Sequence, residues 1–293
     1  MPAPVPGVWP GAGPGRGHGP PADLVRLVGD GPEVVHRPGL GRGAWVVRAS
    51  DGRSAVATES SPAVSALARA AGDRSVGPAV LATVDGWLLA EHLDGPPMTA
   101  LELRRPVVLR EVAALLAVWH STPLAALQVA APVADLAASV RRYRQVAVDV
   151  DPSLRPDVAW AEAALGRLRP VDAVPVLCHL DVAANLIATP SGVRLIDFEF
   201  AAVASPEQEL GQLIWEAELD HAASERLVAC YLETRPAAEG VSVAAAATWC
   251  VAVGVAWTLW ATAVGGPTMR RYARRSRERL ASHWARSLSS DCG

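Results

Sequence analysis

Polar side chains that can bind a metal ion and accept a proton gather in one short part of the chain. The segment HLDVAAN contains His179, Asp181 and Asn185, and the segment LIDFE adds Asp197 and Glu199. Apolar, strand-favouring residues precede each set, so we expect the polar side chains to stand at the strand ends of one hairpin. Carboxylate and amide oxygens arranged in this way suit Mg²⁺ and the phosphates that it bridges. The pattern is typical of phosphoryl transfer, in which one aspartate orients the acceptor hydroxyl while an asparagine and a second aspartate hold metal.

Two regions of different character surround this hairpin. Residues 33–60 and 79–93 contain β-branched runs broken by glycine-rich and Asp-Gly turns, which predicts a small antiparallel sheet, with a helix over 62–71. After the linker DGPPMT, apolar residues recur at helical spacing over 105–120, and helical patterns dominate to the C-terminus. The expected fold is α+β and two-lobed. A sheet lobe covers 23–93, a larger helical lobe covers 94–293, and ligands bind where the two meet.

Composition narrows the range of partners and compartments. Hydrophobic residues make up 51% of the 293-residue chain, which is enough for a large core. The net charge of -3 offers no basic excess, so nucleic acid is not an expected partner. The four cysteines lack the spacing of a zinc site or a disulfide framework, which favours a cytoplasmic location. Residues 1–22 are rich in proline and glycine and are expected to form a disordered tail, without the apolar region of a secretory signal.

One apolar segment, residues 241–266, is long enough to cross a lipid bilayer. It is rich in alanine and carries Trp257 and Trp260 near its middle, whereas membrane-spanning helices concentrate tryptophan at the interfaces. We therefore expect a core helix or the wall of a binding site, without membrane insertion.

The combination of H-x-D-x-x-x-x-N with I-D-F-E resembles the choline kinase and aminoglycoside phosphotransferase superfamily, whose members are relatives of the protein kinases. Three further segments occur in the order of that family. GLGRGAWVV stands at its phosphate-covering loop, WLLAEHLDGPPM at its hinge strand and WHSTPL at the end of the next helix. The resemblance covers about residues 30–285 and implies a two-lobed protein-kinase-like fold that uses ATP and Mg²⁺.

The resemblance also implies roles for single residues. Asp181 matches the catalytic aspartate, and His179 matches the histidine that braces its loop. Asn185 and Asp197 match the metal ligands, although a network that only caps the loop is the alternative for these polar groups. The residues matched to nucleotide binding are Gly39, Gly41, Gly43 and Glu91, and the glycines alone are equally typical of a plain hairpin turn.

The sheet lobe departs from the family at a charged position. Members carry a lysine or arginine on the third strand and a glutamate on the next helix, but here the strand SAVATES has Thr58 at that place and the helix PAVSALARAAG has no glutamate. We expect Arg42, Arg48 or Arg53 to reach the phosphates instead. The alternative is a pseudokinase that binds nucleotide without transfer, and the intact catalytic residues favour an active enzyme.

The residues after IDFEF resemble the acceptor site of the choline kinase branch, which encloses a quaternary ammonium group. The matching residues are Glu199, Phe200, Glu216, Trp257, Trp260 and Tyr272. Ring faces attract a cation, and each contributes about 0.5 to 2 kcal/mol when it is desolvated. The expected function is the ATP-dependent phosphorylation of a small cationic alcohol, choline-like or amino-alcohol-like.

Alternatives remain for this region. Glu216, Glu218 and Asp220 would suit the open, acidic site of an antibiotic or natural-product phosphotransferase of the aminoglycoside type. Two tryptophans at positions i and i+3 are also typical of an ordinary helix core. The arginines between 270 and 279 are expected to lie on a solvated helix face.

Overall fold

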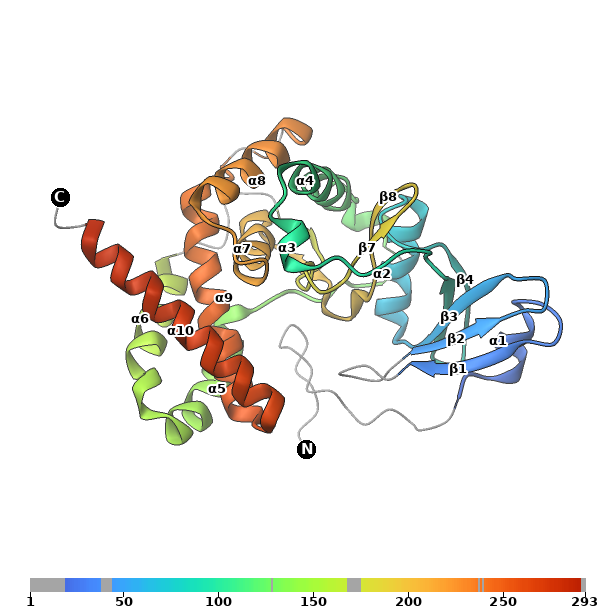
Figure 1. Ribbon diagram of the computed structural model, residues 1–293, viewed down its shortest axis with the longest axis horizontal. Coiled ribbons are helices and arrows are strands. Elements are labelled where there is room, and N and C mark those ends of the chain that lie inside the picture. Colours follow the sequence, from blue (N-terminus) through green and yellow to red (C-terminus); the bar gives the residue numbers. More distant parts are fainter. Residues whose placement is uncertain are drawn as a thin grey trace.

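The computed structural model describes residues 19–37, 44–127, 129–167, 175–236, 238 and 240–290. They form a sheet lobe at one end of the molecule and a helical lobe at the other (Figure 1). The elements of the sheet lobe are α1 (Ala22–Arg26), β1 (Glu33–Arg37), β2 (Ala44–Arg48), β3 (Ser54–Glu59), α2 (Pro62–Asp73), β4 (Val80–Val84) and β5 (Trp87–Glu91). The predicted α+β fold is confirmed, and the helix predicted over 62–71 extends to Asp73.

The sheet is antiparallel throughout, with the strand order β1-β2-β3-β5-β4. Asp85 and Gly86 form the turn between β4 and β5, both with positive φ, as the Asp-Gly signal predicts. One face of the sheet packs against α1, where Leu24, Val47 and Leu89 are fully buried. This apolar contact fixes the strands that lead to the linker.

The helical lobe holds short strands among its helices. Its elements are α3 (Ala100–Leu103), α4 (Pro106–His120), η1 (Leu124–Ala126), α5 (Leu136–Val150), η2 (Pro152–Leu154), α6 (Arg155–Arg167), β6 (Val176–Cys178), β7 (Leu186–Thr189), β8 (Gly192–Leu195), η3 (Phe198–Phe200), β9 (Ala202–Ala204), α7 (Pro206–Glu216), α8 (His221–Thr234), α9 (Val243–Val264) and α10 (Pro267–Ser290).

The polar hairpin and the linker between the lobes are joined by backbone hydrogen bonds. β7 pairs with β8, and β6 pairs with β9, both antiparallel. Met98 N donates to Leu186 O at 2.8 Å, and Ala188 N donates to Pro96 O at 3.1 Å. The linker therefore runs along β7, the strand that directly follows the HLDVAAN segment.

The apolar segment forms α9, which packs against α5, α7 and α10. Among the described residues, α9 is the one helix that is long and apolar enough to cross a membrane, and 56% of its most apolar 18-residue window is buried. A helix that is apolar on all sides suits the interior of a large helical lobe. Its packing is that of the expected core helix.

Two glycines allow α7 and α9 to approach each other closely. A Cβ atom on Gly211 would lie 2.6 Å from Ala246 O, and one on Gly254 would lie 2.6 Å from the ring of Trp215. Both distances are shorter than van der Waals contact, so neither position accepts a larger residue without a shift of the helices. This contact seats α7, and α7 in turn supports the site described next.

Candidate active site

The hairpin places Asp181 and Asn185 in direct contact. β6 ends at Cys178, a loop follows, and β7 begins at Leu186. Asn185 Nδ2 donates to Asp181 O at 2.9 Å and to Asp181 Oδ2 at 2.8 Å. Because both bonds use Nδ2, the Oδ1 atom of Asn185 can serve as a metal ligand.

His179 joins the two sequence motifs of the hairpin. Its Nε2 donates to Ile196 O at 2.8 Å, and its Nδ1 accepts from Asp181 N at 3.3 Å. The carbonyl can only accept, which puts the proton on Nε2. Asp197 follows Ile196 and has a left-handed φ of 62°. The histidine thus braces Asp181 against the segment that carries Asp197, the arrangement that the resemblance implies.

A buried glutamate that the sequence analysis did not single out holds this loop from below. Glu209 is fully buried on α7, and its Oε1 accepts from His179 N at 2.5 Å and from Leu180 N at 2.7 Å. Its Oε2 accepts from His120 Nε2 at 2.5 Å. Burial alone would raise the pKa of Glu209, but the hydrogen bond to His120 and the charge of that residue hold it below its ordinary value. An ionised carboxylate therefore anchors the backbone beside Asp181.

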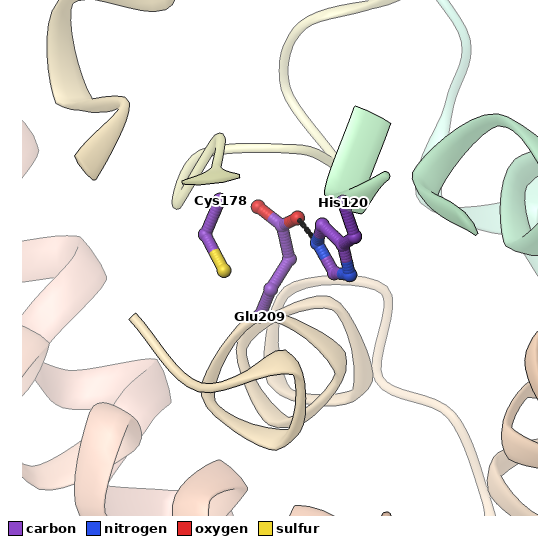
Figure 2. Close-up of side chains that lie close together, drawn as sticks. All are labelled: His120, Cys178 and Glu209. Atoms are coloured by element: carbon purple, nitrogen blue, oxygen red, sulfur yellow. Dashed lines mark hydrogen bonds and ion pairs between the residues drawn. The ribbon is translucent and has the colours of Figure 1, made fainter. Parts of the chain in front are cut away.

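Figure 2 shows Glu209 between the thiol of Cys178 and the ring of His120, three groups whose ligand atoms lie within 4.8 Å of one another. Such a set could hold a metal ion, but each group already has a partner. His120 Nδ1 bonds to Tyr231 Oη at 2.8 Å, and Cys178 Sγ donates to Ser205 O at 3.6 Å. Burial also raises the pKa of the Cys178 thiol well above its usual range, which disfavours a thiolate ligand. The cluster supports the loop.

Three carboxylates share one region of the helical lobe. Burial raises the pKa of Asp181, and the charge of Asp197 adds to the rise, while His179 and Asn185 oppose it. Burial also raises the pKa of Glu216 to about 8, with the charge of Asp181 as the next cause. Like charges repel each other, so a bound cation would favour the ionised forms of Asp181 and Glu216.

The aromatic residues of the expected acceptor site form one cluster, which we define as Trp257, Trp260 and Tyr272. The ring centroids of Trp257 and Trp260 are 5.1 Å apart, and those of Trp257 and Tyr272 are 6.3 Å apart, both edge to face. Burial raises the pKa of Tyr272 to about 12, and the charge of Glu216 is the next cause. The charge of Glu216 therefore acts on this cluster through Tyr272. Phe200 packs in the same hydrophobic cluster as the tryptophans, whereas Glu199 is exposed on η3.

The nucleotide side of the expected site is described in part. Gly39, Gly41 and Gly43 lie outside the described residues. Glu91 ends β5, and its Oε2 accepts from Ala79 N at 3.3 Å. Thr58 lies in β3, opposite Leu88.

Two of the arginines expected to replace the missing cation lie away from Thr58 in the register of the sheet. Arg48 pairs with Ser54, which lies four residues along β3 from Thr58, or about 13 Å. Arg53 lies in the adjacent turn, where its Nε bonds to Asp51 at 2.7 Å. Arg42 lies outside the described residues.

Glu218 lies two residues beyond Glu216 and is engaged by three arginines. Arg104 bonds to it at 2.9 Å, and Arg275 and Arg279 approach it at 3.4 Å and 3.8 Å. The guanidinium of Arg279 also lies 3.9 Å above the centroid of the Trp215 ring. These contacts hold α10 against the end of α7.

The expectation of a solvated arginine face on α10 is correct for some residues and wrong for others. The exposed ones are Arg270, Arg271, Arg274 and Arg275. Arg277 instead pairs with Asp151, and Arg279 is half-buried over Trp215. Both guanidinium groups pair with a carboxylate, and that of Arg279 also stacks on a tryptophan ring. The charge pattern of the sequence does not reveal these partners.

Solved structures of small-molecule kinases share the fold of this chain. A choline kinase from Cryptosporidium parvum Iowa II has a TM-score of 0.71 at 16% identity, covering 89% of this chain and 91% of that one. A choline/ethanolamine kinase family protein from Mesorhizobium loti has a TM-score of 0.65 at 20% identity, with 89% and 92% covered. An aminoglycoside phosphotransferase from Alicyclobacillus acidocaldarius has a TM-score of 0.62 at 17% identity, with 94% and 98% covered. The fold is that of the choline and aminoglycoside kinases.

The sequence itself carries the family assignment. The phosphotransferase enzyme family matches residues 29–241. The chain therefore belongs to the phosphotransferase enzyme family, which confirms the predicted superfamily and the predicted class, a small-molecule kinase. No curated protein matches the chain in sequence.

Proposed function

We propose that the chain transfers a phosphoryl group from ATP to the hydroxyl group of a small cationic alcohol, choline-like or amino-alcohol-like. The observation that carries this proposal is the position of Glu216, whose pKa is raised by burial and by the charge of Asp181 and whose own charge raises the pKa of Tyr272. A cation held by Glu216 and the cluster of Trp257, Trp260 and Tyr272 would present its hydroxyl group toward Asp181. Its positive charge would also relieve the repulsion between Glu216 and Asp181.

Asp181 is the residue proposed to orient the acceptor hydroxyl group and to accept its proton. Its raised pKa makes it a stronger base than an exposed aspartate, and Asn185 Nδ2 fixes the direction of its Oδ2. His179 holds its backbone N–H. These contacts orient the carboxylate so that its second oxygen can accept the hydroxyl proton as the phosphoryl group is transferred.

The donor set of Asn185 and Asp197 fits Mg²⁺. Both offer oxygen atoms, and a cation would offset the charge of Asp197, which adds to the effect of burial in raising the pKa of Asp181. A bound Mg²⁺ would neutralise charge on the ATP phosphates. The chain's own part is to hold Asn185 Oδ1 and the Asp197 carboxylate at the end of one short hairpin.

The aminoglycoside-type alternative requires open acidic groups near the acceptor, and two of its three candidates are already engaged. Glu218 bonds to Arg104 and lies within 4 Å of two further arginines. Asp220 caps α8 by accepting from Ala223 N at 2.8 Å. Of these three carboxylates, Glu216 is the one with neither an arginine partner nor a helix-capping role among the described residues, which favours a small ligand with a single cationic group.

The test is a screen of ATP turnover against choline, ethanolamine, other amino alcohols and aminoglycosides, with Asp181→Asn as the control. We expect turnover with a small cationic alcohol and its loss in the variant. Turnover with aminoglycosides alone would support the alternative. If wild type and variant are equally inactive on every acceptor while nucleotide still binds, the pseudokinase interpretation replaces the proposal.

The role of the acceptor's positive charge is tested by comparing choline with 3,3-dimethylbutan-1-ol, a neutral alcohol of nearly the same shape. We expect the neutral alcohol to bind more weakly in wild type, and Trp257→Ala to raise KM for the cation about 2- to 30-fold, the loss expected for one ring face. KM for ATP should stay unchanged. If Trp257→Ala instead raises KM for the cation and KM for ATP equally, this residue is part of the helix core.

A further inference from the structure

One face of α7 holds the loop that carries Asp181. Glu209, Gln212 and Glu216 are spaced three and four residues apart, so their side chains line one side of the helix. All three bond to the backbone of residues 179–183. The loop is thus attached to α7 over nearly its whole length.

Gln212 occupies the middle of this row and is 1% exposed. Its Nε2 donates to Leu180 O and also to Glu216 Oε1, the latter at 2.8 Å. A side-chain amide has two N–H donors, so these two bonds use both of them. One planar group therefore connects the loop backbone with the carboxylate next to the aromatic cluster.

The carbonyl that Gln212 holds belongs to a strained residue. Leu180 directly precedes Asp181 and has a φ of 60°, a left-handed conformation that is costly for a residue with a side chain. Glu209 accepts from its N–H at 2.7 Å, and Gln212 donates to its C=O. With both polar groups of Leu180 bound to α7, the backbone that aims Asp181 has one defined direction.

Glu216 is bound to the same loop in two ways. Its Oε2 accepts directly from Ala183 N at 3.3 Å, and its Oε1 reaches Leu180 O through the amide of Gln212. A ligand group that binds Glu216 therefore acts on the loop on both sides of Asp181.

We infer that Gln212 is a positioning residue that couples the occupancy of the acceptor site at Glu216 to the alignment of Asp181. The coupling to an acceptor rests on the proposed function, whereas the hold of Gln212 on the loop rests on the contacts alone. An acceptor that fixes Glu216 also fixes the shared amide, and through it the carbonyl of Leu180. The transferable hydroxyl group and its receiving carboxylate would then be aligned in the same event.

The test compares Gln212→Met with Gln208→Met. Methionine keeps the length of the side chain and removes both donors. Gln208 is also buried on α7, at 6% exposure. Among the described residues its side chain makes no hydrogen bond to the loop, so Gln208→Met controls for changes in packing. We expect Gln212→Met to lower kcat about 10- to 100-fold, the scale of a small misplacement of a catalytic group. KM for ATP should change less than twofold, and Gln208→Met should leave kcat near that of wild type.

Two further measurements separate a positioning role from a structural one. Amide hydrogen exchange of residues 179–183 should become faster in Gln212→Met and stay at the wild-type rate in Gln208→Met. Combining Gln212→Met with Glu216→Gln should cost less in kcat than the product of the single effects, because both act through one connection.

The outcomes are distinguishable from a failure of the proposed function. Loop exchange in Gln212→Met that matches the control, or an unchanged kcat, overturns the role of Gln212. If the loss of kcat in the double variant equals the product of the two single losses, the coupling is overturned. A wild type that phosphorylates none of the tested alcohols counts against the proposed function, and the hydrogen-exchange comparison still decides whether Gln212 holds the loop.

Discussion

The carboxyl group of Glu216, on a half-buried side chain, should make the stability of the folded protein depend on pH. Its pKa rises from 4.5 to about 8 on folding, chiefly because of burial. Below pH 4.5 the group is protonated in both the folded and the unfolded chain, and it costs nothing. Between pH 4.5 and 8 the unfolded chain ionises more readily than the folded one, so the free energy of unfolding falls as the pH rises.

The size of the effect follows from the two pKa values. Each pH unit between 4.5 and about 8 costs the folded state about 1.4 kcal/mol, which adds up to at most about 5 kcal/mol above pH 8. Domains are usually stable by about 5 to 15 kcal/mol, so this single group would use a large part of that margin. Glu216→Gln removes the ionisation and keeps the shape of the side chain, and its one amide oxygen can accept either from Gln212 Nε2 or from Ala183 N.

The measurement is urea-induced unfolding of wild type and Glu216→Gln at a series of pH values from 4.5 to 9, without nucleotide or metal. We expect the variant to gain stability relative to wild type as the pH rises, by several kcal/mol over the series. Glu233→Gln is the matched control, because Glu233 is an exposed carboxylate on α8 without an ion pair to a described residue. It should leave the pH dependence of wild type unchanged. If Glu216→Gln and Glu233→Gln show the same pH dependence, Glu216 is ionised in the folded protein and the argument from its burial is refuted.

Three further predictions follow from contacts elsewhere. Gly254→Ala would place a Cβ atom 2.6 Å from the ring of Trp215, so it should lower Tm and reduce the free energy of unfolding by about 1 to 3 kcal/mol. Gly166→Ala is its control, because a Cβ atom on this helical glycine meets nothing within 4 Å, and Tm should stay equal or rise slightly. Glu218→Gln removes partly exposed ion pairs and should cost about 1 kcal/mol in urea unfolding, an effect that high salt should reduce; a loss that is independent of salt would contradict this. Arg48→Ala should leave KM for ATP unchanged, since Arg48 pairs with Ser54, four residues along β3 from Thr58, and a clear rise in KM would show that its guanidinium reaches the phosphates.

The hairpin and its polar residues were predictable because the signal is local. Asp181 and Asn185 are four residues apart, and Asp197 follows after two short strands, so strand periodicity and spacing are enough to place them at one end of a hairpin. The association of Glu216 with Tyr272 is different. These residues are separated by two helices in the chain, and only the resemblance to a known family, not any local pattern, brought them together in the prediction.

The supports of the loop were missed because their signal is weak in isolation. Glu209 and Gln212 look like surface residues of an amphipathic helix, and His120 entered only as part of a motif that ends a helix. The usable signal was the row of polar residues at 209, 212 and 216 on a helix that is buried along most of its length. Burial cannot be read from one helix alone, since it depends on the helices that cover it.

The contact between α7 and α9 has a consequence for the order in which the molecule becomes functional during synthesis. The ribosome makes the hairpin and α7 first, and the apolar helix that seats α7 through Gly211 and Gly254 is completed only at Val264. Until then, the side chains that hold the loop stand on a helix without its main partner. We expect a nascent chain to carry every catalytic residue well before it can work, and to become competent in one late step, when α9 docks.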